Sequence, residues 1–460
     1  MQPQAFGGRT RGGPGSAKSA AFRYPVSIHR LVAPAAGSTV VVGAPHHPGG
    51  AAVHAQACPV TAFFEEFWKH MVETGEDTTV VIVGAGVAGL ALGAFLLRNG
   101  IGCIILEKHS RAYVEKRQRA GTIDSFGVRM FRAWGLEEVL EGDPIPQAGG
   151  GFFIDGEELP VDWEDDDSES LFCPQQVLVR NLTDVFLRDG GDLRFEAADV
   201  SLEDIDGERP LVRYRDTNGS VEVLRCDFVA GCDGDRGVSR AAIPAAALTR
   251  YSYEYGYAWL SVLAEVPAHP SGMAIHSRGL AGVIPRGANA SRLYLQCPID
   301  DTLAQWPDER IWNELEARFG TPVATGPIAD KRLVPLRSVV YSPMNHGRLY
   351  LLGDAAHIVP PMSAKGIHLA LHDAEVFARA VIHRVRKGDS SLLDDYSSTC
   401  LRHVWNYQAF AAWITEIMHN VGDASYAGEF RKQIARAELE RLFTSPTANR
   451  LFSEFSAGVN

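Results

Sequence analysis

The sequence predicts an α/β protein whose centre is a doubly wound parallel sheet. Residues 79–107 read as an apolar strand, a glycine turn, an apolar helix and a second apolar strand, which is the order of a βαβ unit. Residues 348–386 repeat the change from apolar strand to helix through the polar turn Gly353-Asp354. Residues 277–298 alternate around a short turn like strands of a sheet.

Composition limits the classes of function. A chain of 460 residues with 46% hydrophobic and 22% charged residues can bury a core of two or three domains. A net charge of -12 argues against nucleic acid as a partner, and no apolar run is long enough to predict a membrane span. Seven cysteines without a CxxC pair indicate reduced thiols in the cytoplasm, and no metal site is predicted.

Residues 1–76 are predicted to lie outside the folded body. The first 64 residues contain no Asp or Glu and include the helix-breaking segments GGPG, APAAG and HHPGG. Two interpretations are open, an organelle transit peptide and a translation start placed too early, with Met71 as the true first residue. The second is favoured because a strand begins shortly after Met71.

The glycine turn predicts a dinucleotide site. Gly84, Gly86 and Gly89 form GxGxxG: the first allows a tight turn, the second lets backbone approach a pyrophosphate, and the third lets helix and strand pack closely. The phosphates would lie at the helix N-terminus, where unpaired N–H groups favour negative charge. Glu107, at the end of the second strand, could accept hydrogen bonds from a ribose. The motif does not distinguish NAD from FAD.

Two later segments add polar groups at strand ends. Residues 226–240 begin as a strand and end in a polar turn that contains Asp233. Asp354 follows the strand at 348–352, at the carboxyl end where ligands bind in open α/β sheets. Pro360 and Pro361 then fix a loop, and Gly366 opens a long helix.

These segments, in this order, resemble the FAD-dependent aromatic hydroxylases, the group A flavoprotein monooxygenases, and in particular the branch that acts on 4-hydroxybenzoate. Further matches are RAG at 119–121, ERP at 208–210, VAGCDG at 229–234, PLRS at 335–338 and GDAAHIVPP at 353–361. The resemblance implies a Rossmann-like FAD-binding domain, a β-sheet substrate domain and C-terminal helices. It divides the chain into 77–250 (FAD, first part), 251–345 (substrate sheet), 346–390 (FAD, second part) and 391–460 (helices).

The resemblance also implies cofactor contacts. For FAD it implies Gly84, Gly86, Gly89, Glu107, Arg117, Arg119, Gln175, Asp233, Asp354 and Gly366. Residues for the reductant lie near the end of the second strand, where Lys108, His109 and Tyr113 stand, and NADPH is favoured over NADH.

The implied reaction uses NAD(P)H to reduce the flavin and dioxygen to form a C4a-hydroperoxide, which hydroxylates an aromatic ring. The resemblance makes Arg286 a clamp for the carboxylate of a small aromatic acid, with Tyr294 and Trp259 in the pocket. It makes Pro361 a wall of the substrate site, and Lys365 a source of positive potential beside the flavin.

The pocket departs from the 4-hydroxybenzoate branch. Its two relay tyrosines and relay histidine have no counterparts, because Met273–Ile275, Ser456 and Gln147 occupy their places. Ile284, Met362 and His368 replace a serine, a threonine and an asparagine. A more apolar pocket suits an aminobenzoate, and a hydroxybenzoate with His276 or His368 as base is also open. A non-catalytic FAD-binding protein is the alternative from another class, and a homodimer is possible.

Overall fold

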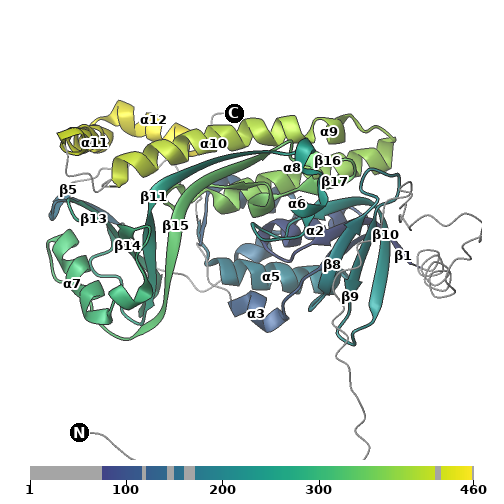
Figure 1. Cartoon of the computed structure of the whole chain (residues 1–460), viewed down its shortest axis with the longest axis horizontal. Coiled ribbons are helices and arrows are strands. Elements are labelled where there is room, and N and C mark those ends of the chain that lie inside the picture. The colour runs from purple at the N-terminus through teal and green to yellow at the C-terminus, as the bar shows by residue number, and fades with distance from the viewer. Residues whose placement is uncertain (1–74, 117–120, 142–149, 160–170, 420–425, 458–460) are drawn as a thin grey trace, which may run out of the picture. The chain divides into compact units, whose positions relative to one another are not determined.

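A computed structural model describes residues 75–116, 121–141, 150–159, 171–419 and 426–457 (Figure 1). These residues form two eight-stranded sheets, a two-stranded ribbon and the helices around them. No helix in these ranges is both long and apolar enough to cross a membrane.

The first sheet is the predicted parallel sheet. Its strands run in the order β16-β17-β10-β1-β2-β7, and β10, β1, β2, β7 and β17 pair in parallel. Strand β9 pairs antiparallel with β10, and β8 pairs antiparallel with β9. The bounds are β1 Glu76–Val83, β2 Cys103–Leu106, β7 Asp192–Arg194, β8 Ala198–Glu203, β9 Leu211–Arg215, β10 Val221–Gly231, β16 Asn345–His346 and β17 Leu349–Leu351.

Helix α2 (Val87–Arg98) packs against both α5 (Gln175–Arg188) and α8 (Gly366–Lys387). Every residue of α2 from Val87 to Leu96 is buried, because neighbours cover the helix on all sides. Three short helices, α3 (Arg111–Lys116), α4 (Ser125–Ala133) and α6 (Ser239–Ala242), fill the turns around this sheet.

The second sheet is antiparallel except at one pair, and its order is β18-β15-β11-β14-β13-β12-β4-β5. Its strands are β4 Gly151–Ile154, β5 Glu157–Leu159, β11 Thr249–Ala264, β12 Gly272–His276, β13 Gly279–Gly287, β14 Ala290–Pro298, β15 Ile328–Ser342 and β18 His357–Ile358. Residues 151–159 therefore belong to this sheet, although the resemblance places them in the first part of the FAD-binding domain (77–250). Their pairing with β12 is a long-range contact that no local pattern announces.

The two faces of the second sheet have different coverings. Residues such as Leu260 and Leu295 pack one face against helix α7 (Asp308–Phe319). The other face carries Trp259, Met273 and Leu280, and it packs against side chains of the C-terminal helices α10 (Tyr396–Met418), α11 (Tyr426–Thr444) and α12 (Pro446–Ala457). Period-2 alternation along each strand produces this division.

The C-terminal helices join the two sheets. They are α9 Ser391–Asp394, α10 Tyr396–Met418, α11 Tyr426–Thr444 and α12 Pro446–Ala457. The first half of α10 places Tyr396 and Val404 in the core of the parallel sheet, and its second half places Phe410 and Ile414 against the second sheet. Figure 1 shows the long strands β11 and β15 passing close to α10.

Candidate active site

The three glycines of the turn after β1 have different surroundings. Gly84 has φ +109, and a Cβ there would lie 2.5 Å from the carbonyl oxygen of Cys232. A Cβ on Gly89 would lie 2.0 Å from the carbonyl oxygen of Gly84, so a side chain would separate helix from turn. At Gly86 a Cβ would meet nothing within 4 Å. The open space lies at the N-terminus of α2, where a pyrophosphate is predicted.

Glu107 lies at the carboxyl end of β2 and is tied to the same turn. Its Oε2 accepts from the N–H of Ala85 (2.9 Å), and its Oε1 accepts from the N–H of His109 (2.9 Å). The predicted nicotinamide residues lie just beyond it: Lys108 is exposed, and the rings of His109 and Tyr113 are 4.1 Å apart. The residues predicted to contact the ribose and those predicted to contact the nicotinamide nucleotide thus follow one another at the carboxyl end of β2.

Asp233 shapes the turn after β10. Its Oδ2 accepts from the N–H of Ser239 (2.8 Å), while its buried Oδ1 has no hydrogen-bond partner. Burial raises the pKa of this carboxyl group, and hydrogen bonds from Ser239 offset only part of the effect. A buried carboxylate oxygen without a partner fits a position beside a hydroxyl-rich ligand.

The Gly353-Asp354 turn meets the glycine turn in space. A Cβ on Gly353 would lie 3.3 Å from the Cβ of Ala370 in α8 and 3.5 Å from the Cβ of Ala88 in α2. Arg240 donates to the carbonyl oxygen of Ala355 (2.8 Å), which joins the Asp233 turn to the same place. Three polar turns, far apart in the sequence, therefore surround the N-termini of α2 and α8.

Asp373 holds this arrangement together and was not foreseen. It is fully buried on α8, and its Oδ2 accepts from the N–H of Gly353 (2.9 Å) and bonds Nε2 of His357 (2.7 Å). The sequence could have indicated it, because Asp373 lies four residues before Phe377 and eight before Val381, on the apolar face of the predicted helix.

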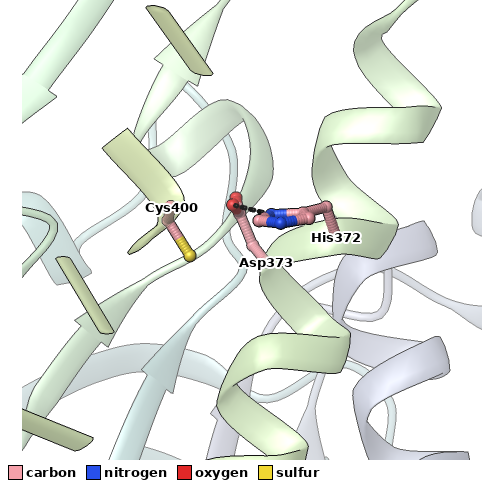
Figure 2. Close-up of side chains that lie close together, drawn as sticks. All are labelled: His372, Asp373 and Cys400. Carbon is pink, nitrogen blue, oxygen red and sulfur yellow. Dashed lines mark ion pairs between the residues drawn. The ribbon is translucent and has the colours of Figure 1, made fainter. Parts of the chain in front are cut away.

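Figure 2 shows Asp373 between His372 and Cys400. A ring nitrogen, a carboxylate oxygen and the sulfur of these residues lie within 4.8 Å of one another, as the ligands of a metal ion would. Burial raises the pKa of the Cys400 thiol well above its usual range, so the sulfur keeps its proton. Because Asp373 already bonds Gly353 and His357, we assign this group to support of the Gly353-Asp354 turn.

The double-proline loop leads into α8 through Ala364, which has φ +53. Pro361 is exposed, and so is Gly366 at the first position of the helix. Lys365 is buried, and its Nζ lies 2.9 Å from Oδ2 of Asp124. The ammonium charge that the resemblance predicts beside the flavin is thus paired with the carboxylate of Asp124.

One face of the second sheet gathers the predicted pocket residues. Ile284, Tyr294 and Met362 all pack against the apolar cluster that contains Trp259. The Trp259 and Tyr294 rings have centroids 4.6 Å apart. Trp259 also donates from Nε1 to Nε2 of His419 (2.7 Å), a buried partner at the end of α10 that sequence reasoning missed.

Arg286, on β13 of the second sheet, lies against the segment that precedes α5. A Cβ on Gly121 would lie 2.6 Å from Nη1 of Arg286 and 2.7 Å from Cα of Pro174. Pro174 directly precedes Gln175, the first residue of α5. The predicted carboxylate clamp thus lies against the chain segments predicted to bind FAD. Arg117, Arg119 and Gln147 lie outside the described residues.

Arg292 is a buried cation on the same face of the sheet as Tyr294. Its side chain is 4% exposed, and Nη1 lies 3.4 Å from Oγ of Ser261. Burial lowers the pKa of its guanidinium, and the charge of Arg286 acts in the same direction. Its place two residues before Tyr294 on β14 was the signal available in the sequence.

Fold and site together define a flavin-dependent aromatic hydroxylase. The family described as FAD binding domain matches residues 77–411, and the chain belongs to it. A p-hydroxybenzoate hydroxylase of Acinetobacter baylyi is 34% identical over 395 residues, which cover 83% of this chain and 95% of that protein. A probable NADH-specific resorcinol 4-hydroxylase of Rhodococcus jostii is 28% identical over 71% of this chain and 62% of its own length.

Solved structures support the fold. A p-nitrophenol 4-monooxygenase from Pseudomonas putida has a TM-score of 0.69 at 19% identity, covering 84% of this chain and 100% of that chain. An aklavinone-11 hydroxylase in complex with FAD and aklavinone has a TM-score of 0.66 at 19% identity, covering 77% and 72%. The predictions of fold class, FAD cofactor and aromatic monooxygenase are confirmed.

Proposed function

We propose that this flavin-dependent hydroxylase acts on a small aromatic carboxylic acid of the benzoate type. The observation that carries the proposal is the position of Arg286, which extends from the second sheet to Gly121 and Pro174, beside the segments predicted to bind FAD. A guanidinium fork matches a carboxylate, and one such contact contributes about 1.5–3 kcal/mol. The apolar and aromatic side chains beside it suit the ring of the same ligand.

The residues of the chain fit FAD. The open space at Gly86 would take the pyrophosphate, while the buried Oδ1 of Asp233 and the strand-end carboxylate of Asp354 would face the sugar and ribityl hydroxyls. When bound, FAD supplies the activation of dioxygen and the transfer of one oxygen atom to the ring.

The protein must then orient the substrate and keep water away. Arg286 would fix the acid end, and Tyr294 and Trp259 would line the ring. Trp259 is 3% exposed and donates to His419, and this fixed position supports its proposed role as a wall of the pocket. Met362 and Pro361 would close the substrate pocket on the side where the double-proline loop lies.

Two candidate substrates differ in the substituent that donates electrons to the ring: an amino group in an aminobenzoate and a hydroxyl group in a hydroxybenzoate. Ile284, Met362 and Met273 lie on the apolar cluster, which favours a donor group that needs no deprotonation, as in an aminobenzoate. A hydroxybenzoate is supported by the 34% identical relative, whose name states p-hydroxybenzoate. Of the two histidines considered as a base, His276 accepts from the N–H of Arg278 in the β12–β13 turn, whereas His368 lies beside Lys365 and Asp124.

NADPH is our proposed reductant, with NADH as the alternative. The exposed ammonium of Lys108 and the His109–Tyr113 pair offer a cation and an aromatic surface for a phosphorylated nucleotide. The name of the Rhodococcus relative favours NADH for that protein.

Two wider expectations belong to the proposal. The six described cysteines are buried free thiols, which supports a reducing, cytoplasmic compartment. Exposed apolar side chains on α11 and α12, among them Phe430, Ile434 and Leu451, support a homodimer that covers them.

A panel of hydroxybenzoates and aminobenzoates tests the proposal. Each acid is added to FAD-loaded protein, and both the oxidation of NADPH or NADH and the oxygenated product are measured. We expect at least one acid to accelerate nicotinamide oxidation strongly and to be hydroxylated. A yellow protein that no acid stimulates would support the non-catalytic alternative.

A further inference from the structure

Three histidines gather beside the start of α8. His368 and His372 come from α8 and His403 from α10. Nε2 of His368 lies 2.9 Å from Nε2 of His403, which is hydrogen-bond distance. The rings of His372 and His403 stack with centroids 3.7 Å apart and planes 11° apart.

The inner end of this group meets an ion pair. Nδ1 of His368 lies 2.7 Å from Oδ2 of Asp124, the oxygen that also accepts from Nζ of Lys365. A carboxylate only accepts, so His368 carries its proton on Nδ1 and presents the lone pair of Nε2 to His403. His403 must then donate from Nε2. The two hydrogen bonds of His368 therefore form a continuous chain of donors and acceptors from His403 to Asp124.

Burial falls along this chain of hydrogen bonds toward solvent. The His368 side chain is 2% exposed, whereas His403 is only half-buried. Phe126 and Tyr407 flank His368, each with its ring centroid 4.4 Å away. The chain of hydrogen bonds therefore runs from the half-buried His403 past the rings of Phe126 and Tyr407 to the Lys365–Asp124 pair.

Burial is the main reason that both imidazoles stay neutral. Burial lowers the pKa of His368, and it lowers that of His403 to about 3, assisted by the nearby imidazoles of His372 and His368. Burial alone would raise the pKa of Asp124, but His368 and Lys365 outweigh it and hold that pKa well below its usual range. A neutral imidazole has one donor and one acceptor nitrogen, as proton transfer along a chain requires.

The proposed reaction needs a proton from solvent. A monooxygenase of this class converts Ar–H, O2, NADPH and H⁺ into Ar–OH, H2O and NADP⁺. The nicotinamide gives two electrons as hydride, one oxygen atom enters the ring C–H bond, and the other leaves as water with the solvent proton completing the balance. A site that excludes water must admit this proton by another route.

We propose that His403 and His368 form a proton relay from solvent to the Lys365–Asp124 pair at the start of α8. His403 takes a proton from water and passes the one on Nε2 to Nε2 of His368, which passes the one on Nδ1 to Asp124. As Asp124 accepts, the ammonium of Lys365 gives one proton to the reaction, and Asp124 returns its proton to Lys365, so that one proton moves from water to the site in each turnover. This inference rests on the proposed function, because only turnover consumes the proton. His372 stacks on His403 without a hydrogen bond to it and is a neighbour of the relay.

The kinetic test compares His403→Ala and His368→Asn with His383→Gln, an exposed α8 histidine paired with Asp389. With FAD, NADPH and the best aromatic acid, the two relay variants should turn over roughly tenfold or more slowly, and the control should match the wild type. Added imidazole should restore His403→Ala. Unchanged turnover in the relay variants, or a slow His403→Ala that imidazole leaves slow, would overturn the relay.

A second readout is independent of turnover. In protein labelled with ¹⁵N-histidine, NMR should find the proton of His368 on Nδ1 and that of His403 on Nε2, and Asp124→Asn should change the His368 signals. A His368 protonated on Nε2 would overturn the relay. A wild-type protein that hydroxylates no acid would refute the proposed function instead, and the NMR result would still decide whether the chain of hydrogen bonds exists.

Discussion

At the scale of single residues, Arg286 carries the specificity of the proposed site. Arg286→Ala should weaken binding of every carboxylated ligand roughly 10- to 100-fold, because a charge-assisted contact of about 1.5–3 kcal/mol is lost. Arg286→Lys keeps the charge without the fork, so its loss should be smaller. Ligand titration by flavin absorbance measures both. Equal affinity in wild type and Arg286→Ala would show that another residue binds the carboxylate.

His419 makes the stability of the protein depend on pH. Its pKa is lowered to about 4 by burial, against about 6.5 in an unfolded chain, so the unfolded state binds more protons between these values. Folding stability is therefore lost as pH falls from about 6.5 toward 4. From pH 7 to pH 5 this one group should cost roughly 2 kcal/mol.

Urea unfolding at the two pH values checks this prediction. In His419→Gln, where the amide oxygen can still accept from Trp259, the loss between pH 7 and pH 5 should be smaller than in the wild type. An identical pH dependence in both proteins would mean that His419 is not buried as a neutral imidazole.

At the scale of elements, the glycine turn separates packing from ligand binding. Gly89→Ala should destabilise the fold, since the new Cβ would lie 2.0 Å from a backbone oxygen. Gly86→Ala should leave the melting temperature of the FAD-free protein almost unchanged, because its Cβ meets nothing within 4 Å, yet it should weaken FAD binding. Thermal unfolding and FAD titration measure the two effects. The same loss of stability in both variants would contradict this division.

The elements also show what the sequence can and cannot predict. The βαβ unit was readable because its signals are local: apolar periodicity, three glycines and a strand-end acid. The partners of Lys365 and Trp259 were not readable, because Asp124 and His419 lie 241 and 160 residues away along the chain. Such pairs depend on how helices pack on sheets, which no local spacing specifies.

At the scale of the whole chain, the proposed site depends on α10, which packs against both sheets, and on Arg286, which reaches from the second sheet to Gly121. Predicted FAD contacts come from turns of the parallel sheet, and predicted substrate contacts come from one face of the antiparallel sheet. FAD should therefore stabilise the protein by mass action, raising the melting temperature as its concentration exceeds the dissociation constant. A melting temperature that FAD does not change would contradict its placement at these turns.

The most direct test of the central claim is turnover under ¹⁸O₂. The FAD-loaded enzyme is given NADPH and the aromatic acid that best accelerates NADPH oxidation, and the product is examined by mass spectrometry. We predict one ¹⁸O atom in each hydroxylated acid, with NADPH consumed in proportion to product. Unlabelled acid, with all NADPH oxidation recovered as hydrogen peroxide, would contradict the account.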